Sequence, residues 1–220
     1  ILRASRPAVE VGHAYLTRKH VRAVEPLGVI EANAVRRIYE RGAGDRASWL
    51  WSYKLMRPMS GSLLVVPCFL GGCTDRLSSV ELMDAAGSKV SLRGGRMSGA
   101  FWIPDGILDA AQSGSRIGIA EGIATALSIS QVAFPCIAAR SCVNLKAAAE
   151  ALRKRFKRAD LVVCADRGNG ELQARKAALA IGAGFMRPTF DPALVAAFKE
   201  KTGGDKPTDF NDYFIATGDI

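Results

Sequence analysis

Short apolar runs alternate with longer amphipathic segments throughout the second half of the chain. Runs of this length that are rich in β-branched residues predict buried strands, and the apolar spacing between them predicts helices. The predicted strands are residues 116–122, 135–139, 160–166 and 185–188. The predicted helices are residues 123–133, 144–156 and 171–183. Such regular alternation predicts a parallel sheet that is flanked by helices on both faces.

The first half of the chain follows a different pattern. Residues 31–42 predict one short helix that ends at Gly42. The residues expected on its inward face are Ala34, Val35, Ile38 and Tyr39. Short β-type runs separated by glycine-containing turns then predict antiparallel hairpins. These predicted strands are residues 62–70, 78–85, 89–94 and 100–104. Residues 1–11 show no clear periodicity and are expected to form an arm or a linker.

The whole pattern predicts an α/β protein in two parts. The first is a smaller α+β subdomain over residues 1–110, and the second is the parallel-sheet domain over residues 111–220. The longest apolar runs, such as residues 63–70, are far shorter than the roughly 20 residues of a membrane-spanning helix, so no membrane segment is expected. Because the chain starts at Ile1 without an initiator Met, we expect it to be a piece of a longer protein with flanking domains.

The net charge and the cysteine content predict the kind of binding partner and the cellular compartment of the protein. Thirty basic residues against 21 acidic ones give a net charge of +9, which favours a polyanionic partner such as nucleic acid. The alternative is that the excess of basic residues only keeps the protein soluble. Five irregularly spaced cysteines without a secretory signal indicate a reduced, cytoplasmic compartment, and their spacing does not match a zinc site.

Four carboxylates are candidates for one site. Glu121 ends the first strand of the predicted parallel sheet, and Asp166 ends the third. The carboxyl ends of such strands lie at one edge of a sheet, where reactive groups gather. Asp209 and Asp212 are expected in a loop that returns past this edge. Carboxylate oxygens there suit Mg²⁺ or Mn²⁺ and phosphoryl transfer. The alternative is that Glu121 and Asp166 only cap the helices that follow them.

Basic and polar side chains provide the candidates for nucleotide or nucleic-acid binding. Arg93 and Arg96 lie in the glycine-rich stretch "SLRGGRMSGAF", where guanidinium groups and turn amides could bind phosphate oxygens together. The alternative is a hairpin loop with solvated arginines. Arg167, directly after Asp166, and Asn144, which is also a plausible helix N-cap, are the further candidates.

Several enzyme classes are disfavoured because their motifs are absent from the sequence. The first strand-to-helix turn of the second half, "AEGIATA", lacks the Gly-x-Gly-x-x-Gly of dinucleotide-binding domains. No Gly-x-x-x-x-Gly-Lys-Ser/Thr phosphate loop occurs anywhere in the chain. No Gly-x-Ser-x-Gly elbow occurs either, so serine hydrolase chemistry has little support.

An ordered set of motifs resembles the Toprim primase domain of phage- and plasmid-encoded DNA primases, which carry an EGYATA-like motif. In the second half the matching stretches are "EGIATA" at 121–126, "NLKAAAEAL" at 144–152, "VVCAD" at 162–166 and "DFND" at 209–212. The first half resembles the segment that precedes Toprim in these proteins. Its matching stretches are "HAYLTRKHV" at 13–21, "LLVVP" at 63–67 and "GGRMSGAFWI" at 94–103. The resemblance therefore covers almost the whole chain.

The resemblance implies a catalytic core that polymerises ribonucleotides into a primer on single-stranded DNA. It implies Mg²⁺ or Mn²⁺ held by acids of the Toprim sheet, with Glu121 as a general acid/base or metal-site residue. Asp166 takes the place of the first aspartate of the family's Asp-x-Asp pair. A helicase or zinc-binding domain in the same longer chain is an implied partner.

The sequence departs from this family pattern at one position. Gly168 stands where the second aspartate of the pair is expected, and a metal site that loses an oxygen ligand binds more weakly. Glu171, Asp209 or Asp212 could supply the missing oxygen. Two hypotheses follow: a DNA primase, or a catalytically impaired Toprim module that binds single-stranded nucleic acid for a replication or conjugation partner.

Overall fold

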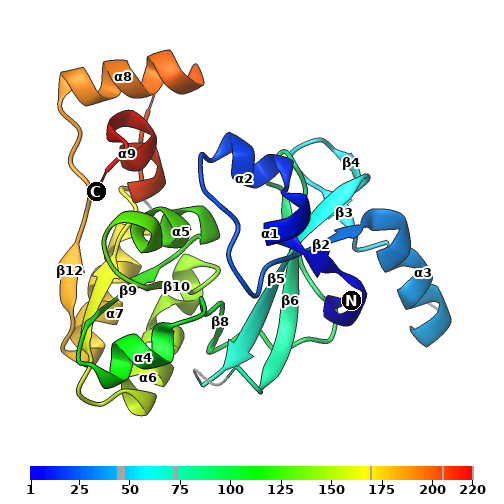
Figure 1. The fold of residues 1–220 in the computed structure, drawn as a ribbon, viewed down its shortest axis with the longest axis horizontal. Coiled ribbons are helices and arrows are strands. Elements are labelled where there is room, and N and C mark those ends of the chain that lie inside the picture. The colour runs from blue at the N-terminus through cyan, green and yellow to red at the C-terminus, as the bar shows by residue number, and fades with distance from the viewer. Residues whose placement is uncertain (44–47, 72–73, 169, 205, 220) are drawn as a thin grey trace. The chain divides into compact units, whose positions relative to one another are not determined.

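The computed structural model describes residues 1–43, 48–71, 74–168, 170–204 and 206–219. The chain divides into two compact units, whose elements are labelled in Figure 1. The first unit comprises Ile1–Cys68 and Leu77–Met97, and the second comprises Phe69–Arg76 and Ser98–Ile220. The domain boundary at residue 110 stays a prediction. Among the described residues, no helix combines the length and the apolar character that crossing a bilayer would require.

The first unit is built on a largely antiparallel sheet of order β1-β2-β5-β6-β7. Its strands are β1 (Arg6–Pro7), β2 (Gly28–Glu31), β5 (Ser62–Leu70), β6 (Leu77–Met83) and β7 (Lys89–Ser91). A separate pair consists of β3 (Trp51–Ser52) and β4 (Arg57–Pro58). The predicted hairpin strands are thus largely confirmed. The strands β2, β3 and β4 were not predicted, because sequences this short show little periodicity.

The described residues of the first unit also form the helical segments η1 (Leu2–Ala4), α1 (Ala8–Val11), α2 (Ala14–Arg18) and α3 (Ala32–Ala43). The helix predicted over residues 31–42 is confirmed by α3, and Val35 is fully buried in the core against β5. Ile38, however, is 37% exposed, so its predicted inward position was wrong. The prediction of an arm or linker over residues 1–11 was also wrong, because these residues form η1, β1 and α1.

The second unit contains a four-stranded parallel sheet of order β10-β9-β11-β12. Its strands are β9 (Arg116–Ala120), β10 (Cys136–Ala138), β11 (Asp160–Cys164) and β12 (Gly184–Met186). β8 (Ala100–Phe101) pairs with the end of β5, and Trp102 bridges to Ala138. All four predicted strands of the second half are confirmed. β9, β10 and β11 are largely buried, as continuous apolar runs predict, whereas the edge strand β12 is only partly buried.

The helices of the second unit are α4 (Ile107–Gln112), α5 (Ile123–Val132), η2 (Cys142–Asn144), α6 (Leu145–Arg155), α7 (Glu171–Ile181), α8 (Pro192–Thr202) and α9 (Phe210–Thr217). α5, α6 and α7 confirm the predicted helices, whereas α4, α8 and α9 were not predicted. α5 is buried without interruption from Ile123 to Ile129, as expected of a helix that is apolar all round. α9 packs against it, and Nδ2 of Asn211 donates to Oγ of Ser128 over 2.9 Å.

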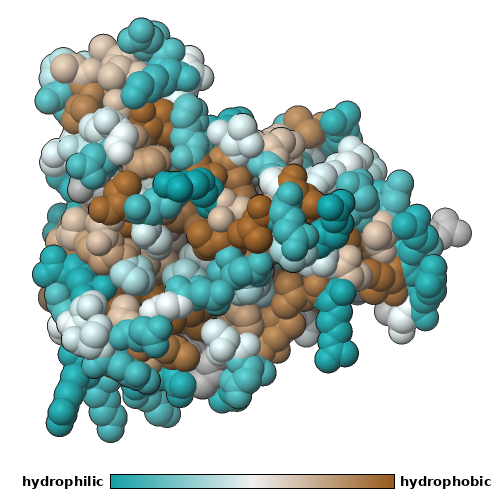
Figure 2. All heavy atoms as spheres, in the orientation of Figure 1, coloured by the Kyte–Doolittle hydropathy of each residue, from teal (hydrophilic) through white to brown (hydrophobic). Residues whose placement is uncertain are grey.

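The basic run at residues 153–158 begins in the last turn of α6, where one of its arginines has a structural role. The guanidinium of Arg153 donates to the carbonyls of Ile181 (3.2 Å) and Ala159 (2.8 Å). These hydrogen bonds satisfy backbone carbonyls beyond the end of α6. Arg153 therefore has a structural role that needs no bound ligand. Figure 2 shows hydrophilic side chains projecting from the part of the second unit where α4 and α6 lie.

The strand order of this sheet reverses between β9 and β11. The connection from β9 to β10 runs one way along the sheet, and the connections from β10 to β11 and from β11 to β12 run the other way. Right-handed crossovers therefore put α5 on one face and α6 and α7 on the opposite face. Ligands of open α/β sheets bind where the order reverses, outside the carboxyl ends of the strands. Here the reversal lies directly beyond Ala120 and Cys164, which are register partners.

Candidate functional site

Glu121 directly follows β9 at this reversal. Its main chain continues the parallel pairing, because its carbonyl accepts from the amide of Arg140 over 2.8 Å. Its half-buried side chain faces the start of α7: a Cβ added to Gly170 would lie 2.9 Å from Oε2 of Glu121 and 3.6 Å from Cβ of Cys142. The Glu121 carboxylate therefore lies close to Gly170, at the edge formed by the carboxyl ends of the strands.

Asp166 lies at the same edge, two residues after β11 ends. The amide of Ala165 donates to the carbonyl of Met186 over 2.9 Å, so pairing with β12 also continues past the strand. Because Cys164 is the register partner of Ala120, Glu121 lies one residue and Asp166 two residues beyond the same level of the sheet. Asp166 is half-buried. The catalytic roles of Glu121 and Asp166 stay predictions.

Asp209 and Asp212 begin a helix, so the loop expected at these residues was wrong. Asp209 is the N-cap of α9, and its Oδ1 accepts from the amide of Asp212 over 2.8 Å. Oδ2 of Asp212 accepts from the amide and the hydroxyl of Thr208, over 2.8 Å and 3.3 Å. Both carboxylates thus satisfy backbone amides that a helix start leaves open. Metal binding by either aspartate stays a prediction.

Glu171 is engaged by two arginines. Its Oε1 accepts from Nη2 of Arg175 over 2.8 Å, and its Oε2 accepts from Nη1 of Arg187 over 3.1 Å. Hydrogen bonds from Arg175 and then Arg187 hold the pKa of the Glu171 carboxyl below its ordinary value. In this arrangement the Glu171 carboxylate binds two guanidinium groups, so it does not take the place of the oxygen ligand that is missing at Gly168.

The sheet edge offers two carboxylates to a metal ion, and metal binding there stays a prediction. Among the described residues, no three side chains of His, Cys, Asp and Glu come close enough together to hold an ion. Two carboxylates, Glu121 and Asp166, nevertheless lie at the reversal point. Mg²⁺ is commonly held by one or two carboxylates, several waters and substrate phosphates, and two acids suffice for that kind of site.

Asn144 has a different environment from the one expected of a nucleotide-binding residue. It stands at the N-cap position of α6, as predicted, but its side chain makes no capping bond there. Instead Oδ1 accepts from the amide of Gly99 over 2.8 Å, and Nδ2 donates to the carbonyls of Ala100 and Ala139, each over 2.7 Å. The buried amide therefore ties β8 to the end of β10. Nucleotide binding by Asn144 stays a prediction.

Arg140 is a residue that the sequence analysis missed. It is 3% exposed, directly follows Ala139 at the carboxyl end of β10, and has a φ of 79°, which is rare for a residue other than glycine. Buried arginines are uncommon and backbone strain clusters at functional sites. The signal in the sequence was a charged residue at the end of a fully apolar strand, "CIAAR".

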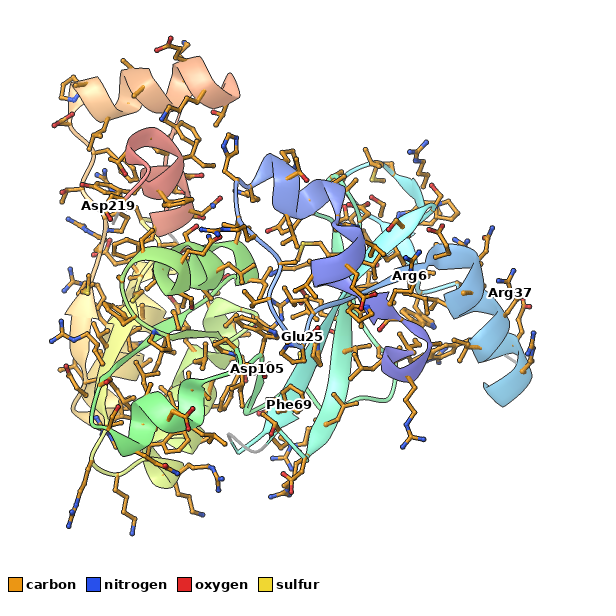
Figure 3. All side chains as sticks on the ribbon, viewed as in Figure 1. Arg6, Glu25, Arg37, Phe69, Asp105 and Asp219 are labelled. Carbon is orange, nitrogen blue, oxygen red and sulfur yellow. The ribbon has the colours of Figure 1, made fainter. Side chains whose placement is uncertain are left out.

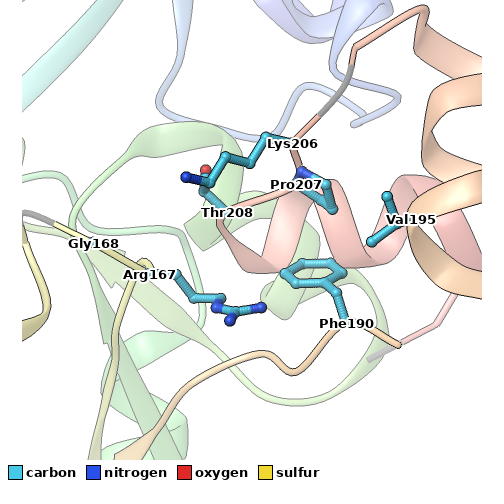
Figure 4. A pocket seen from close by; sticks show the side chains of 7 residues that line it. All are labelled: Arg167, Gly168, Phe190, Val195, Lys206, Pro207 and Thr208. Atoms are coloured by element: carbon cyan, nitrogen blue, oxygen red, sulfur yellow. The ribbon is translucent and has the colours of Figure 1, made fainter. Parts of the chain in front are cut away.

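Arg167 lines a pocket of about 400 Å³ in the second unit (Figure 4). Its amide donates to the carbonyl of Thr208 over 2.7 Å, which joins the loop after β11 to the segment before α9. Its side chain is exposed. Lys206 and Phe190 also line the pocket, and no pattern in the sequence indicated them.

Arg93 and Arg96 belong to the first unit and are both exposed. Their main chain is fixed: the hydroxyl of Tyr39 donates to the carbonyl of Arg93 over 3.2 Å, and the hydroxyl of Ser78 donates to the carbonyl of Arg96 over 2.6 Å. The turn is therefore held by its carbonyls while the guanidinium groups reach solvent. Phosphate binding by these arginines stays a prediction.

The first unit has a hollow of its own, of about 360 Å³. Arg6 from β1 and Arg37 from α3 line it together with Glu31 (Figure 3). The acid offsets part of the positive charge of the two arginines, so this hollow is less selective for anions than the pocket beside Arg167.

The second unit matches a known protein family, and the chain as a whole resembles solved structures. A family model of the Toprim domain matches residues 116–219. The RNA polymerase domain of Mycobacterium tuberculosis primase DnaG superposes with a TM-score of 0.54 at 13% identity, covering 92% of this chain and 75% of that one. The zinc-binding and RNA polymerase domains of Aquifex aeolicus primase superpose with a TM-score of 0.51 at 15% identity, covering 97% of this chain and 53% of that one.

A third structure is similar over a smaller part of the chain. The primase fragment of the bacteriophage T7 primase-helicase protein gives a TM-score of 0.46 at 15% identity and covers 69% of this chain. The chain spans 57% of the length of that fragment. The family model and the two longer superpositions confirm the predicted Toprim resemblance and the predicted fold class.

Proposed function

We propose that this protein is the catalytic core of a DNA primase. The basis is that residues 116–219 form a Toprim domain, in a chain that has the fold of primase catalytic cores. In this role it synthesises RNA primers on single-stranded DNA by metal-dependent nucleotidyl transfer. One observation carries the proposal: Glu121 and Asp166 follow neighbouring strands at the point where the strand order reverses. A binding crevice is expected at such a point on physical grounds.

The two carboxylates are proposed to act at the reacting phosphate. Glu121 and Asp166 would hold Mg²⁺ or Mn²⁺ together with phosphate oxygens of a ribonucleotide. A divalent ion bound there supplies charge neutralisation on the attacking and leaving oxygens. The carboxylate of Glu121 lies close to Gly170, so this glycine leaves room for the position that the proposed catalysis requires.

The template and further partners are also proposals. The net charge of +9 supports binding of single-stranded DNA, and Arg93 and Arg96 are the proposed phosphate contacts in the first unit. A helicase or a zinc-binding domain in the same longer protein is a proposed partner. The Aquifex aeolicus structure contains a zinc-binding domain, and the phage fragment comes from a primase-helicase, which supports this proposal.

The direct test is primer synthesis. The full-length protein is incubated with single-stranded DNA, ribonucleotides and Mg²⁺ or Mn²⁺, and the products are resolved by length. We expect Glu121→Gln and Asp166→Asn each to abolish the products while the melting temperature is kept. Glu150→Gln is the matched control, because it removes one exposed carboxylate on α6 that only pairs with Lys146. Wild-type yields in both site variants would contradict the proposal.

A second candidate function is favoured by the residue at position 168. Because Gly168 offers no carboxylate, the domain could be a Toprim module that binds single-stranded nucleic acid without catalysis and serves a replication or conjugation partner. The same assay separates the two functions. No product with either metal, together with unchanged binding of single-stranded DNA in Glu121→Gln and Asp166→Asn, would favour the module.

A further inference from the structure

The pocket beside Arg167 has the size and the construction of a small-molecule site. Its volume of about 400 Å³ lies within the range of roughly 300–1,000 Å³ that is usual for ligand pockets. Three parts of the second unit form it: the loop after β11, the segment from Phe190 into α8, and the segment from Lys206 to Thr208 that leads into α9. Figure 4 shows these side chains around one opening.

The charge of the pocket selects for an anion. Arg167 and Lys206 both line it, and none of the lining residues that the structure describes is acidic. Neither cation forms an ion pair with a carboxylate in the part of the chain that the structure describes. A guanidinium and an ammonium on one opening suit phosphate oxygens, because charge-assisted hydrogen bonds to phosphate are stronger than neutral ones.

Arg167 is held in place before any ligand arrives. Its amide donates to the carbonyl of Thr208, and its Cζ lies 5.8 Å from the centroid of the Phe190 ring. Phe190 in turn packs at a tilt on Tyr213, with ring centroids 5.9 Å apart. A guanidinium oriented by an aromatic ring loses little freedom when it binds, which favours affinity.

Most of the remaining lining that the structure describes is apolar. Phe190, Val195 and Pro207 supply this wall, and Thr208 adds a hydroxyl. An inorganic anion would leave the wall exposed to water, whereas a ligand with an anionic end and a flat apolar end would cover both parts. Nucleotides have this construction, and bases stack well on aromatic rings and guanidinium planes.

We propose that this pocket binds a nucleotide without a metal ion, with the phosphate between Arg167 and Lys206 and the base against the wall that contains Phe190. The choice of a nucleotide over other organic phosphates rests on the proposed function. Gly168 supports the proposal, because a second carboxylate at that position would repel a phosphate held directly by the two cations. The nucleotide is either a free ribonucleotide or one unit of a single strand.

The test measures nucleotide binding in the presence of EDTA. Binding of ATP, pyrophosphate and adenosine to the full-length protein is followed by calorimetry, so that phosphate and base contribute separately. We expect ATP to bind more tightly than pyrophosphate or adenosine. Arg167→Gln and Lys206→Gln should each weaken ATP binding at least about tenfold, the loss of one charge-assisted hydrogen bond. Lys176→Gln, which removes one exposed positive charge from α7, should leave it unchanged.

A further variant tests the apolar wall, and a competition identifies the source of the nucleotide. Phe190→Leu should weaken ATP binding at least about fivefold and pyrophosphate binding by a smaller factor, since the base contact is lost while Arg167 loses only its aromatic support. A thermal melt of each variant checks that it folds. Displacement of ATP by an oligothymidylate in EDTA assigns the pocket to a single strand, and failure to displace assigns it to free nucleotide.

Two results would overturn the inference: no ATP binding in EDTA, or ATP binding in EDTA that folded Arg167→Gln and Lys206→Gln variants retain in full. These results are distinct from a failure of the proposed function. A protein that binds ATP in EDTA through these cations but makes no primer with Mg²⁺ or Mn²⁺ contradicts primase activity alone. A protein that makes primers but binds no ATP in EDTA contradicts the pocket alone.

Discussion

The carboxylate of Glu121 lies directly against the backbone of Gly170: a Cβ on this glycine would lie 2.9 Å from Oε2 of Glu121. Gly170 is the N-cap residue of α7 and has φ −84° and ψ −16°, which any residue adopts easily. The glycine is therefore required by the close approach of Glu121 and not by its own conformation. The loop that follows Asp166 thus sets the position of the acid that follows β9.

Gly170→Ala should separate activity from stability. The added methyl group displaces the Glu121 carboxylate, and displacement of a catalytic group by about 1 Å can cost about 100-fold in rate. We expect primer synthesis to fall by about that factor while the free energy of unfolding changes by less than about 1 kcal/mol. Primer yield and urea-induced unfolding measure the two quantities. Gly42→Ala, where a Cβ meets nothing within 4 Å, is the control, and equal yields in both variants would contradict the role of the contact.

Asp209 offers a way to distinguish a helix cap from a metal ligand. Asparagine caps a helix as well as aspartate does, whereas alanine does not. If Asp209 only caps α9, Asp209→Ala should lower the free energy of unfolding by about 1 kcal/mol, and Asp209→Asn should leave stability and activity nearly unchanged. If Asp209 also holds an ion, Asp209→Asn should raise the Mg²⁺ concentration needed for half-maximal primer synthesis. Titration of Mg²⁺ against primer yield decides between the two roles.

The sequence predicted the parallel sheet and its acids for a clear physical reason. Strands that are buried on both faces have continuous apolar runs, and the residue after such a run must lie at the edge of the sheet. The positions of Glu121 and Asp166 at one edge therefore follow from the apolar pattern alone. The reversal of strand order between β9 and β11 does not, because periodicity carries no information on strand order.

Other parts of the site depend on long-range packing and could not be predicted. Asp209 caps a short helix and Asp212 lies in its first turn, but the amphipathic pattern of this helix is weak, so both were expected in a loop. Arg140 is buried and has a positive φ, and its sequence neighbours predict neither property. The pocket beside Arg167 joins a loop to residues about 40 positions later in the chain, Lys206 to Thr208, and only the folded chain brings them together.

Asn144 is expected to matter for stability through three hydrogen bonds. Asn144→Ala leaves the amide of Gly99 and the carbonyls of Ala100 and Ala139 without this partner inside the second unit. We expect the free energy of unfolding to fall by about 3 kcal/mol, because each buried polar group left without a partner costs about 1–3 kcal/mol. Asn33→Ala, at an exposed position on α3, should change it by less than about 0.5 kcal/mol. Similar urea midpoints for the two variants would contradict the structural role of Asn144.

The buried His13 should make the first unit sensitive to pH. Its Nδ1 accepts from the amide of Tyr15 over 3.3 Å and its Nε2 contacts the carbonyl of Ser62 over 3.1 Å, an arrangement that suits the neutral ring with its proton on Nε2. Burial lowers the pKa of His13 below its ordinary value of 6.5, more than the Ser62 carbonyl and Asp84 raise it. The folded protein therefore binds a proton at His13 less readily than the unfolded chain does.

The sign of the pH effect follows from this lowered pKa. Between the folded pKa and 6.5 the unfolded chain binds more protons, so the free energy of unfolding should fall as the pH drops below about 6.5, and the loss should be complete below the folded pKa. Urea-induced unfolding at several values between pH 7.5 and 5, followed by tryptophan fluorescence, measures this slope. His13→Gln should flatten it because no titrating group remains at that position, whereas His20→Asn should retain it, since His20 is exposed. A slope that His13→Gln leaves intact would assign the pH dependence to other groups.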